Sequence, residues 1–291
     1  MKKVLLTTTA LVMTAGVAAA EVSFSGTAQV SMAATGGADM ALNTHLDVNA
    51  AVSGSTDNGI TMSTSFGYDA GIYADYNDDF TIDANDGDDW GAGAPEIAIG
   101  YNGWTIAAQN GGVENKYDGD VENHDLSIDG SIGGVTVGFG TTSGAGGASS
   151  YSVGYTAGDI SASMASTSDD GAGASAMSFS LSYTMGDATV TASSDNEGAA
   201  DTTNSVGVSY VMGDLTVGYT MAGDNGANMG DDYDLSVGYS AGPLSATFAT
   251  NETSRTRVVA EYDLGGATAF FSSQQGGGST ELQAMGINFA F

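Results

Sequence analysis

The sequence predicts an all-β protein, a transmembrane antiparallel up-and-down β-barrel of 16 to 18 strands. Its 44 glycines and two prolines among 291 residues disfavour both a helical protein and a collagen-like one. A Tyr-x-x-Gly phrase recurs along the second half of the chain, with turn residues at its end. Between the copies, large apolar residues alternate with small polar ones at period two, which indicates strands with two different faces.

The composition excludes several other classes of protein. The chain carries 35 Asp and Glu against five Lys and Arg, a formal net charge of −30. Such a polyanion repels the phosphate backbone, which excludes nucleic acid as a partner. Disulfide scaffolds and thiolate metal sites are excluded because there is no cysteine. Hydrophobic residues make up 42% and aromatic residues 9%, which indicates a folded chain and not a disordered one.

The chain begins with the pattern of a secretory signal peptide. Lys2 and Lys3 precede an apolar run at residues 4–17, and three alanines follow at residues 18–20. The run is interrupted by threonines and is shorter than the roughly 20 apolar residues that span a bilayer. We therefore predict a signal peptide at residues 1–20 and a barrel domain at residues 21–291.

Cleavage would make the charge imbalance larger. Removing two lysines leaves 5 − 2 = 3 bases against 35 acids, a net charge of −32. The three remaining bases are Lys116, Arg255 and Arg257.

Short turns divide the chain into paired strands. The pair Asn102 and Gly103 has the positive φ preference of a two-residue hairpin turn. Similar turns are expected near Asn58, Asn102, Gly133, Gly158, Gly186, Gly213, Gly242 and Gly265. Eight short turns imply nine longer connections and 18 strands.

The two strand faces predict where water and lipid lie. Met177, Phe179, Leu181 and Tyr183 alternate with serines, and later strands repeat this pattern. A soluble sandwich would present long polar side chains on its solvent face, whereas this small face has almost none. Ser, Thr and Gly suit the wall of a water-filled barrel with the large residues facing lipid. The Tyr before each short turn then indicates an interfacial girdle, although packing in a soluble protein is an alternative explanation.

The last strand predicts how the barrel closes. Met285, Ile287, Phe289 and Phe291 alternate with small residues up to the end of the chain. In a barrel, this strand would pair with the first one, at residues 21–32, and its aromatic side chains would lie against lipid.

The chain resembles the general porins of Gram-negative bacteria, in particular the Rhodobacter-type porins of alphaproteobacteria. The residues that carry the resemblance are segments 21–26, 52–60, 99–104 and 289–291, together with the signal peptide and the Tyr-x-x-Gly repeat. The resemblance implies 16 strands, an outer-membrane location, a homotrimer and recognition of Phe291 by the barrel-assembly machinery. It also implies that the third outer connection folds into the pore and that the second reaches towards a neighbouring subunit.

Two acidic connections and a few strand residues are the candidate pore residues. They lie within residues 70–94 and 110–125, and the second of these connections is short for a porin constriction loop. The candidates for the pore and constriction are Glu114, Lys116, Asp118, Asp120, Glu122, Arg255, Arg257, Glu261, Asp47 and Asp129. Alternation points Arg255 and Arg257 at the lumen, but both residues could equally lie in an outer loop.

These residues predict a passive diffusion channel. Rings of carboxylates favour cations in a pore. We therefore expect a water-filled, cation-preferring channel for small hydrophilic solutes and ions, which contacts outer-membrane lipid and needs no cofactor.

Three other interpretations follow from single features. Asp83, Asp86 and Asp88 suggest weak Ca²⁺ binding by a loop, but Ala94 stands where an EF-hand has its twelfth-position acid, so a solvated acidic loop is the alternative. A hydrolase would need one of the two histidines, His45 and His124, as a base; hydrogen bonding to wall carboxylates explains an inward histidine equally well.

The third interpretation is a different class of protein. A secreted, acidic, Gly- and Ser-rich structural or adhesive surface protein would share this composition, in the form of a β-solenoid. Solenoid repeats are shorter and more uniform, and would not end in alternating aromatic residues.

Overall fold

The computed structural model describes residues 20–34, 39–77, 80, 82–86, 95–119, 121–144, 147–169, 174–197, 201–224, 229–275 and 281–291. The predicted signal peptide, residues 1–20, lies outside this part of the chain except for Ala20. Among the described residues, no helix is long and apolar enough to cross a membrane.

All regular secondary structure in the described residues is β-strand. The strands are β1 (Glu21–Ala34), β2 (Ala41–Ser55), β3 (Thr61–Asp75), β4 (Asp83–Asp86), β5 (Ile97–Tyr101), β6 (Trp104–Glu114), β7 (Glu122–Ile132), β8 (Val135–Thr141), β9 (Ser149–Ala157), β10 (Ile160–Thr167), β11 (Ala176–Met185), β12 (Ala188–Glu197), β13 (Asp201–Met212), β14 (Leu215–Asp224), β15 (Asp232–Ala241), β16 (Leu244–Asn251), β17 (Thr256–Asp263), β18 (Ala267–Gln275) and β19 (Glu281–Ala290).

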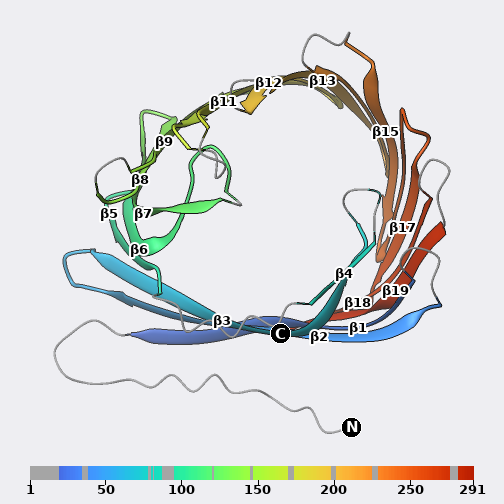
Figure 1. Ribbon diagram of the computed structural model, residues 1–291, viewed down its shortest axis with the longest axis horizontal. Helices are drawn as coiled ribbons and strands as arrows, with labels where there is room; N and C mark the ends of the chain where they lie inside the picture. Colours follow the sequence, from blue (N-terminus) through green and yellow to red (C-terminus); the bar gives the residue numbers. More distant parts are fainter. Residues whose placement is uncertain are drawn as a thin grey trace, which may run out of the picture.

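Eighteen of these strands, all except β4, form one closed antiparallel barrel. Each strand pairs with its neighbours in the sequence, and β1 pairs with both β2 and β19, from Thr27 opposite Ala290 to Ala34 opposite Gln283. Figure 1 shows the resulting ring of strands, with β4 inside it. The predicted fold class is confirmed, and the number of strands is the upper value of the predicted range.

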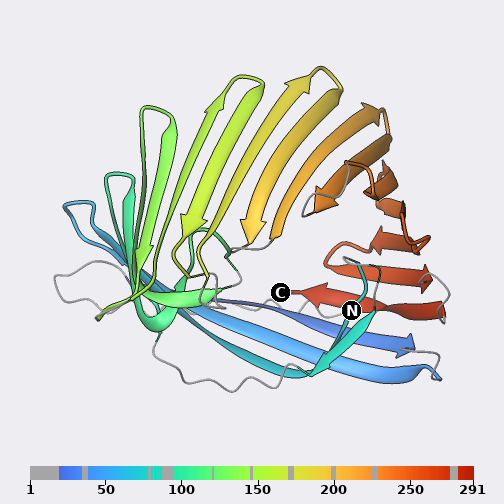
Figure 2. The same cartoon turned by 45° about the horizontal axis from the view of Figure 1, so that its top comes forward.

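The eight predicted short turns all join neighbouring strands at one rim of the barrel (Figure 2). Asn102 and Gly103 have φ values of 50° and 79°, the two positive angles that a tight hairpin turn requires. At Gly158 the φ value is 57°. The turns are also linked to each other, because Thr184 N donates to Asp159 O at 2.8 Å and Val211 N to Asp187 O at 2.9 Å. At these positions each turn is therefore bonded to the hairpin that follows it.

The alternation in the sequence separates the two surfaces of the wall. On β11, Met177, Phe179, Leu181 and Tyr183 are exposed on the outer surface, while the serines between them are half-buried on the inner surface. The tyrosines before the short turns are exposed in the same way: Tyr101, Tyr155, Tyr183, Tyr210, Tyr239 and Tyr262. A continuous apolar outer surface of this kind marks a membrane-facing surface.

The seam between the two ends of the chain leaves no room for a side chain at Gly26. Gly26 N donates to Phe291 O at 2.9 Å, and Phe291 N donates to Gly26 O at 3.1 Å. A Cβ atom on Gly26 would collide with the backbone oxygen of Asp47 and lie 2.8 Å from the Phe291 ring. The predicted pairing of the last strand with the first is thus confirmed, and it extends to the terminal residue.

We predict that Gly26→Ala destabilises the barrel by about 1–3 kcal/mol, the usual cost of overpacking. The measurement is the free energy of unfolding in urea, followed by far-UV circular dichroism of the refolded protein. Gly238→Ala is the matched control, because its new Cβ atom would have its nearest neighbour at 3.9 Å. Equal stability of the two variants would contradict this account of the seam.

Candidate functional site

The inner surface of the barrel is small, polar and acidic. Among the described residues, the carboxylates that face the lumen from strands include Asp47, Asp69, Asp129, Asp195, Asp232, Asp234 and Glu261. Among the described residues, the bases on this side are Lys116 and Arg257. The lumen wall therefore carries a strong excess of negative charge.

The end of β3 leaves the wall and turns into the lumen. β3 pairs with β5 only at Thr61–Thr64, whereas Ile72–Asp75 pair with β4 inside the ring (Figure 1). The departure begins at Gly71, which has a φ value of 91°. A Cβ atom there would collide with the backbone oxygen of Thr44, so this bend requires glycine. We call the described residues 72–77, 80 and 82–86 the inner hairpin.

A glutamine on β1 holds the backbone of the inner hairpin. Gln29 Nε2 donates to Ala74 O at 3.2 Å, and Gln29 Oε1 accepts from Ala74 N at 2.8 Å. The Gln29 side chain thus replaces the strand partner that this part of β3 lost when it left the wall. Gln29 and Ala74 are both buried, where an unpaired backbone group would be costly.

Tyr76 is the main anchor of the inner hairpin. Its ring stacks on Phe270 of β18, with centroids 3.8 Å apart and an angle of 3° between the planes. The Tyr76 hydroxyl donates to Glu261 Oε1 at 2.8 Å and accepts from Asn288 Nδ2 at 3.2 Å. Burial, followed by the hydrogen bond to Glu261, raises the pKa of the Tyr76 phenol, so the phenol keeps its proton and donates.

The backbone oxygen of Tyr76 is bound as well. It accepts from Ser272 Oγ at 2.9 Å and from Gln274 Nε2 at 3.0 Å. Around this point, buried apolar side chains form a small cluster on the inner wall: Ala33, Ala74, Tyr76, Ile82, Val259, Phe270 and Ala284. The inner hairpin is therefore packed against β1, β17, β18 and β19 in the manner of a protein core.

For the described residues, this position differs from one expectation of the resemblance; residues 87–94 lie outside the described part. The second outer connection was expected to reach towards a neighbouring subunit, but its described residues lie inside the barrel. The physical reason is the apolar and aromatic anchor at Tyr76 and Ile82, which is buried only when the segment folds inwards.

The third outer connection also enters the lumen. The hairpin of β6 and β7, with its turn at residues 115–121, lies over the inner faces of β9 and β10. Asn115 is buried and donates to Thr167 Oγ1 and to Asp169 O, both at 2.9 Å. The Lys116 amide donates to Ser150 Oγ at 2.8 Å.

Two further side chains fix this hairpin. Lys116 Nζ lies 2.8 Å from Asp129 Oδ2. The Tyr117 hydroxyl donates to Asp195 on β12. The hairpin is therefore attached to the wall from β7 to β12, and one of the two bases in the described lumen is paired with a carboxylate.

The other predicted pore residues lie in several places. Glu114 and Glu122 face each other at the base of the β6–β7 turn, Asp118 lies in that turn, and Asp120 is outside the described residues. Asp47 faces the lumen, where both of its oxygens accept from Asn49 Nδ2 at 3.2 Å.

The two arginines lie in different environments. Arg257 faces the lumen from β17, with its guanidinium carbon 5.3 Å from the centre of the Phe80 ring. Arg255 precedes β17 in an outer connection and is exposed. Of the two placements that the sequence left open, Arg257 takes the lumen and Arg255 the outer connection, because the strand begins only at Thr256.

The two histidines hold the wall together. His124 is fully buried, with Nε2 2.7 Å from Ser150 Oγ and Nδ1 3.3 Å from Thr142 Oγ1. His45 contacts Asp69 across β2 and β3. Ser150 is itself fully buried under Lys116, so its hydroxyl is not presented to a solute.

The calcium hypothesis concerns side chains that are not described. The side chains of Asp83 and Asp86 lie outside the described part of the structure, and so does the whole of Asp88. Within the residues that the structure does describe, no three His, Cys, Asp or Glu side chains come together as a metal site.

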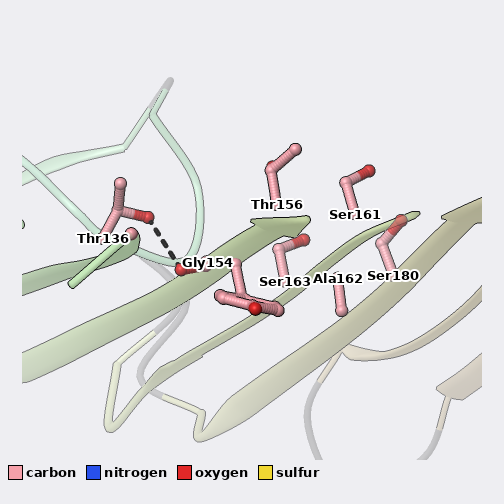
Figure 3. Close-up of a pocket in the computed structure, with 9 residues that line it drawn as sticks. Thr136, Gly154, Thr156, Ser161, Ala162, Ser163 and Ser180 are labelled. Atoms are coloured by element: carbon pink, nitrogen blue, oxygen red, sulfur yellow. Dashed lines mark hydrogen bonds between the residues drawn. The ribbon is translucent and has the colours of Figure 1, made fainter. Parts of the chain in front are cut away.

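A recess of about 290 Å³ lies in the wall of β8 to β11 (Figure 3). Hydroxyl groups and glycines line it, among them Thr136, Gly154, Thr156, Ser161 and Ser163. No charged side chain lines it. It is a neutral part of an otherwise acidic wall.

Sequence reasoning missed the residues that anchor the inner hairpin. Gln29, Tyr76, Phe270 and Gln274 are common residue types, and nothing in their spacing links them. One local signal exists: the small-large alternation of β3 breaks at Gly71, where the strand leaves the wall.

Wall and lumen together define a porin-type β-barrel. The solved structures that this chain is similar to include three engineered variants of the porin of Rhodopseudomonas blastica. Their TM-scores are 0.59, 0.58 and 0.59 at 15%, 14% and 16% sequence identity, and each match covers 93% of this chain and 100% of the porin. Searches of family models and of curated proteins return no match to the sequence.

Proposed function

We propose that this protein is an outer-membrane porin, a water-filled channel for the passive diffusion of small hydrophilic solutes and ions, with a preference for cations. The observation that carries the proposal is the lumen: an inner wall of Ser, Thr, Gly and carboxylates inside a barrel of 18 strands. Barrels of this size leave an aqueous passage. No reaction is needed for this function.

The cation preference rests on the balance of charge in the lumen. At least seven carboxylates of the described residues face it from strands, and one of them, Asp129, is paired with the base Lys116. Fixed negative charge in a confined passage attracts cations and repels anions. Arg257 is the other base, and it lies beside the aromatic face of Phe80.

The proposed location and assembly rest on the outer surface and on the porin resemblance. An exposed apolar belt with a tyrosine girdle suits the outer membrane of a Gram-negative bacterium. The homotrimer, the recognition of Phe291 by the assembly machinery and the signal peptide stay predictions.

The experiment that tests the function is a reversal-potential measurement in a planar bilayer. Purified protein is inserted between compartments of unequal KCl concentration, and the zero-current voltage is read. We expect the sign that corresponds to cation passage, because the lumen is acidic. Anion preference would contradict the selectivity, and a complete absence of conductance would contradict the channel.

The two arginines provide a matched pair for the selectivity. We predict that Arg257→Gln raises the cation-to-anion permeability ratio by roughly two- to fivefold, because it removes a positive charge from the lumen wall. Arg255→Gln, in an exposed outer connection, is expected to change the ratio much less. The same bilayer measurement checks both variants, and equal shifts would show that the position of Arg257 does not matter.

A further inference from the structure

The inner wall is divided into covered and open parts. The most buried polar residues of the wall lie under the two hairpins: Ser272 and Gln274 under the inner hairpin, and Ser150 and Thr167 under the β6–β7 hairpin. These residues are at most 3% exposed. Polar side chains on the wall of a water-filled barrel become this buried only when another segment lies on them.

Among the described residues, strands β13 to β16 carry the more exposed part of the inner wall. Thr216, Thr220 and Ser240 face the lumen there and are exposed, and Ser236 is half-buried. No inward polar side chain on these strands is among the buried ones, whereas the inward Ala249 of β16, opposite Arg257 at the edge of this arc, is buried. The open arc lies between β12, which holds Tyr117 through Asp195, and β17, which holds Tyr76 through Glu261.

One carboxylate stands out on the open arc. Asp234 lies on β15, opposite Thr220 on β14. Its side chain faces the lumen and is exposed. By contrast, Glu261 accepts from the Tyr76 hydroxyl and from Ser245 Oγ, and Asp129 is paired with Lys116. Asp234 is therefore the more exposed of the two inward carboxylates of β15, with Asp232, Glu252 and Arg257 as its charged neighbours.

We propose that the two anchored hairpins confine the passage to the arc of β13 to β16, and that Asp234 is the carboxylate that permeating cations pass there. The inference rests on the proposed channel function and extends it: it assigns the route and a specificity-determining residue. The Tyr76 anchor makes the inner hairpin a fixed part of the wall, since the segment is held by stacking and by hydrogen bonds at both ends of the Tyr76 residue.

Cysteine labelling tests the route directly, because the chain contains no cysteine. Thr220→Cys reports the open arc, and Ser272→Cys reports the covered wall; both introduce one thiol on the inner face. The probe is a positively charged trimethylammonioethyl methanethiosulfonate, and the readout is the intact mass of the protein in lipid vesicles. We expect labelling at Thr220 to be faster by a factor on the order of ten or more, because the covered site reacts only after local opening.

Releasing the anchor provides the second arm. Tyr76→Ala is expected to speed the labelling of Ser272→Cys and to raise the single-channel conductance, while labelling of Thr220→Cys stays unchanged. If Ser272→Cys does not fold, Ser31→Cys on β1 serves as the covered reporter, since Ser31 is also buried. Equal labelling of open and covered reporters in the unmodified background would overturn the confinement.

The charge assignment has its own variant. Asp234→Asn is expected to lower the cation-to-anion permeability ratio more than Glu261→Gln does, because Glu261 is already engaged by Tyr76 and Ser245. A smaller effect at Asp234 would overturn its role. If the unsubstituted protein carries no current but the difference in labelling remains, the proposed channel function is contradicted. The conclusion that the hairpins cover part of the wall would then still hold.

Discussion

The whole structure depends on one set of backbone hydrogen bonds, those that join the last strand to the first. An open sheet of this length would leave two rows of unpaired N–H and C=O groups, which cannot be tolerated beside hydrocarbon. Pairing from Thr27 with Ala290 to Ala34 with Gln283, and then between Gly26 and Phe291, removes both edges. Because closure leaves no unpaired strand edge, the outer surface can be largely apolar. Closure also makes the inner wall enclose a lumen.

In the lumen, polar hydrogen bonds and one small apolar cluster hold two in-folded segments against the wall. The two in-folded hairpins are held by buried side-chain groups, such as Gln29 under Ala74 and Asn115 against Thr167. Each of these bonds satisfies a group that burial would otherwise penalise. Tyr76 and Phe270 add an aromatic stack in this part of the wall. The same contacts that fix the hairpins also occupy Lys116 and Glu261, which alters the charge that solutes meet.

The strands and short turns of the wall could be predicted from the sequence, because each is determined by residues that are close together in the chain. Period-two alternation and turn residues such as Asn102 and Gly103 fix each hairpin, and counting turns gives 18 strands. The porin resemblance placed the third connection in the lumen but did not indicate that the described residues of the second fold inwards, because the contacts of Tyr76 join residues 185 to 212 positions apart. Long-range pairs of common residue types leave no pattern in a single sequence, so the anchor and the open arc became visible only in three dimensions.

The central claim is that this chain closes into a barrel in the outer membrane. Its most direct test is electrophoretic: the outer-membrane fraction is run in SDS with and without boiling. The account predicts a compact, fast-migrating form that converts to the mobility of an unfolded chain of 29.0 kDa only on boiling. A chain absent from that fraction, with the same mobility before and after heating, would contradict the closed barrel and favour a secreted surface protein instead.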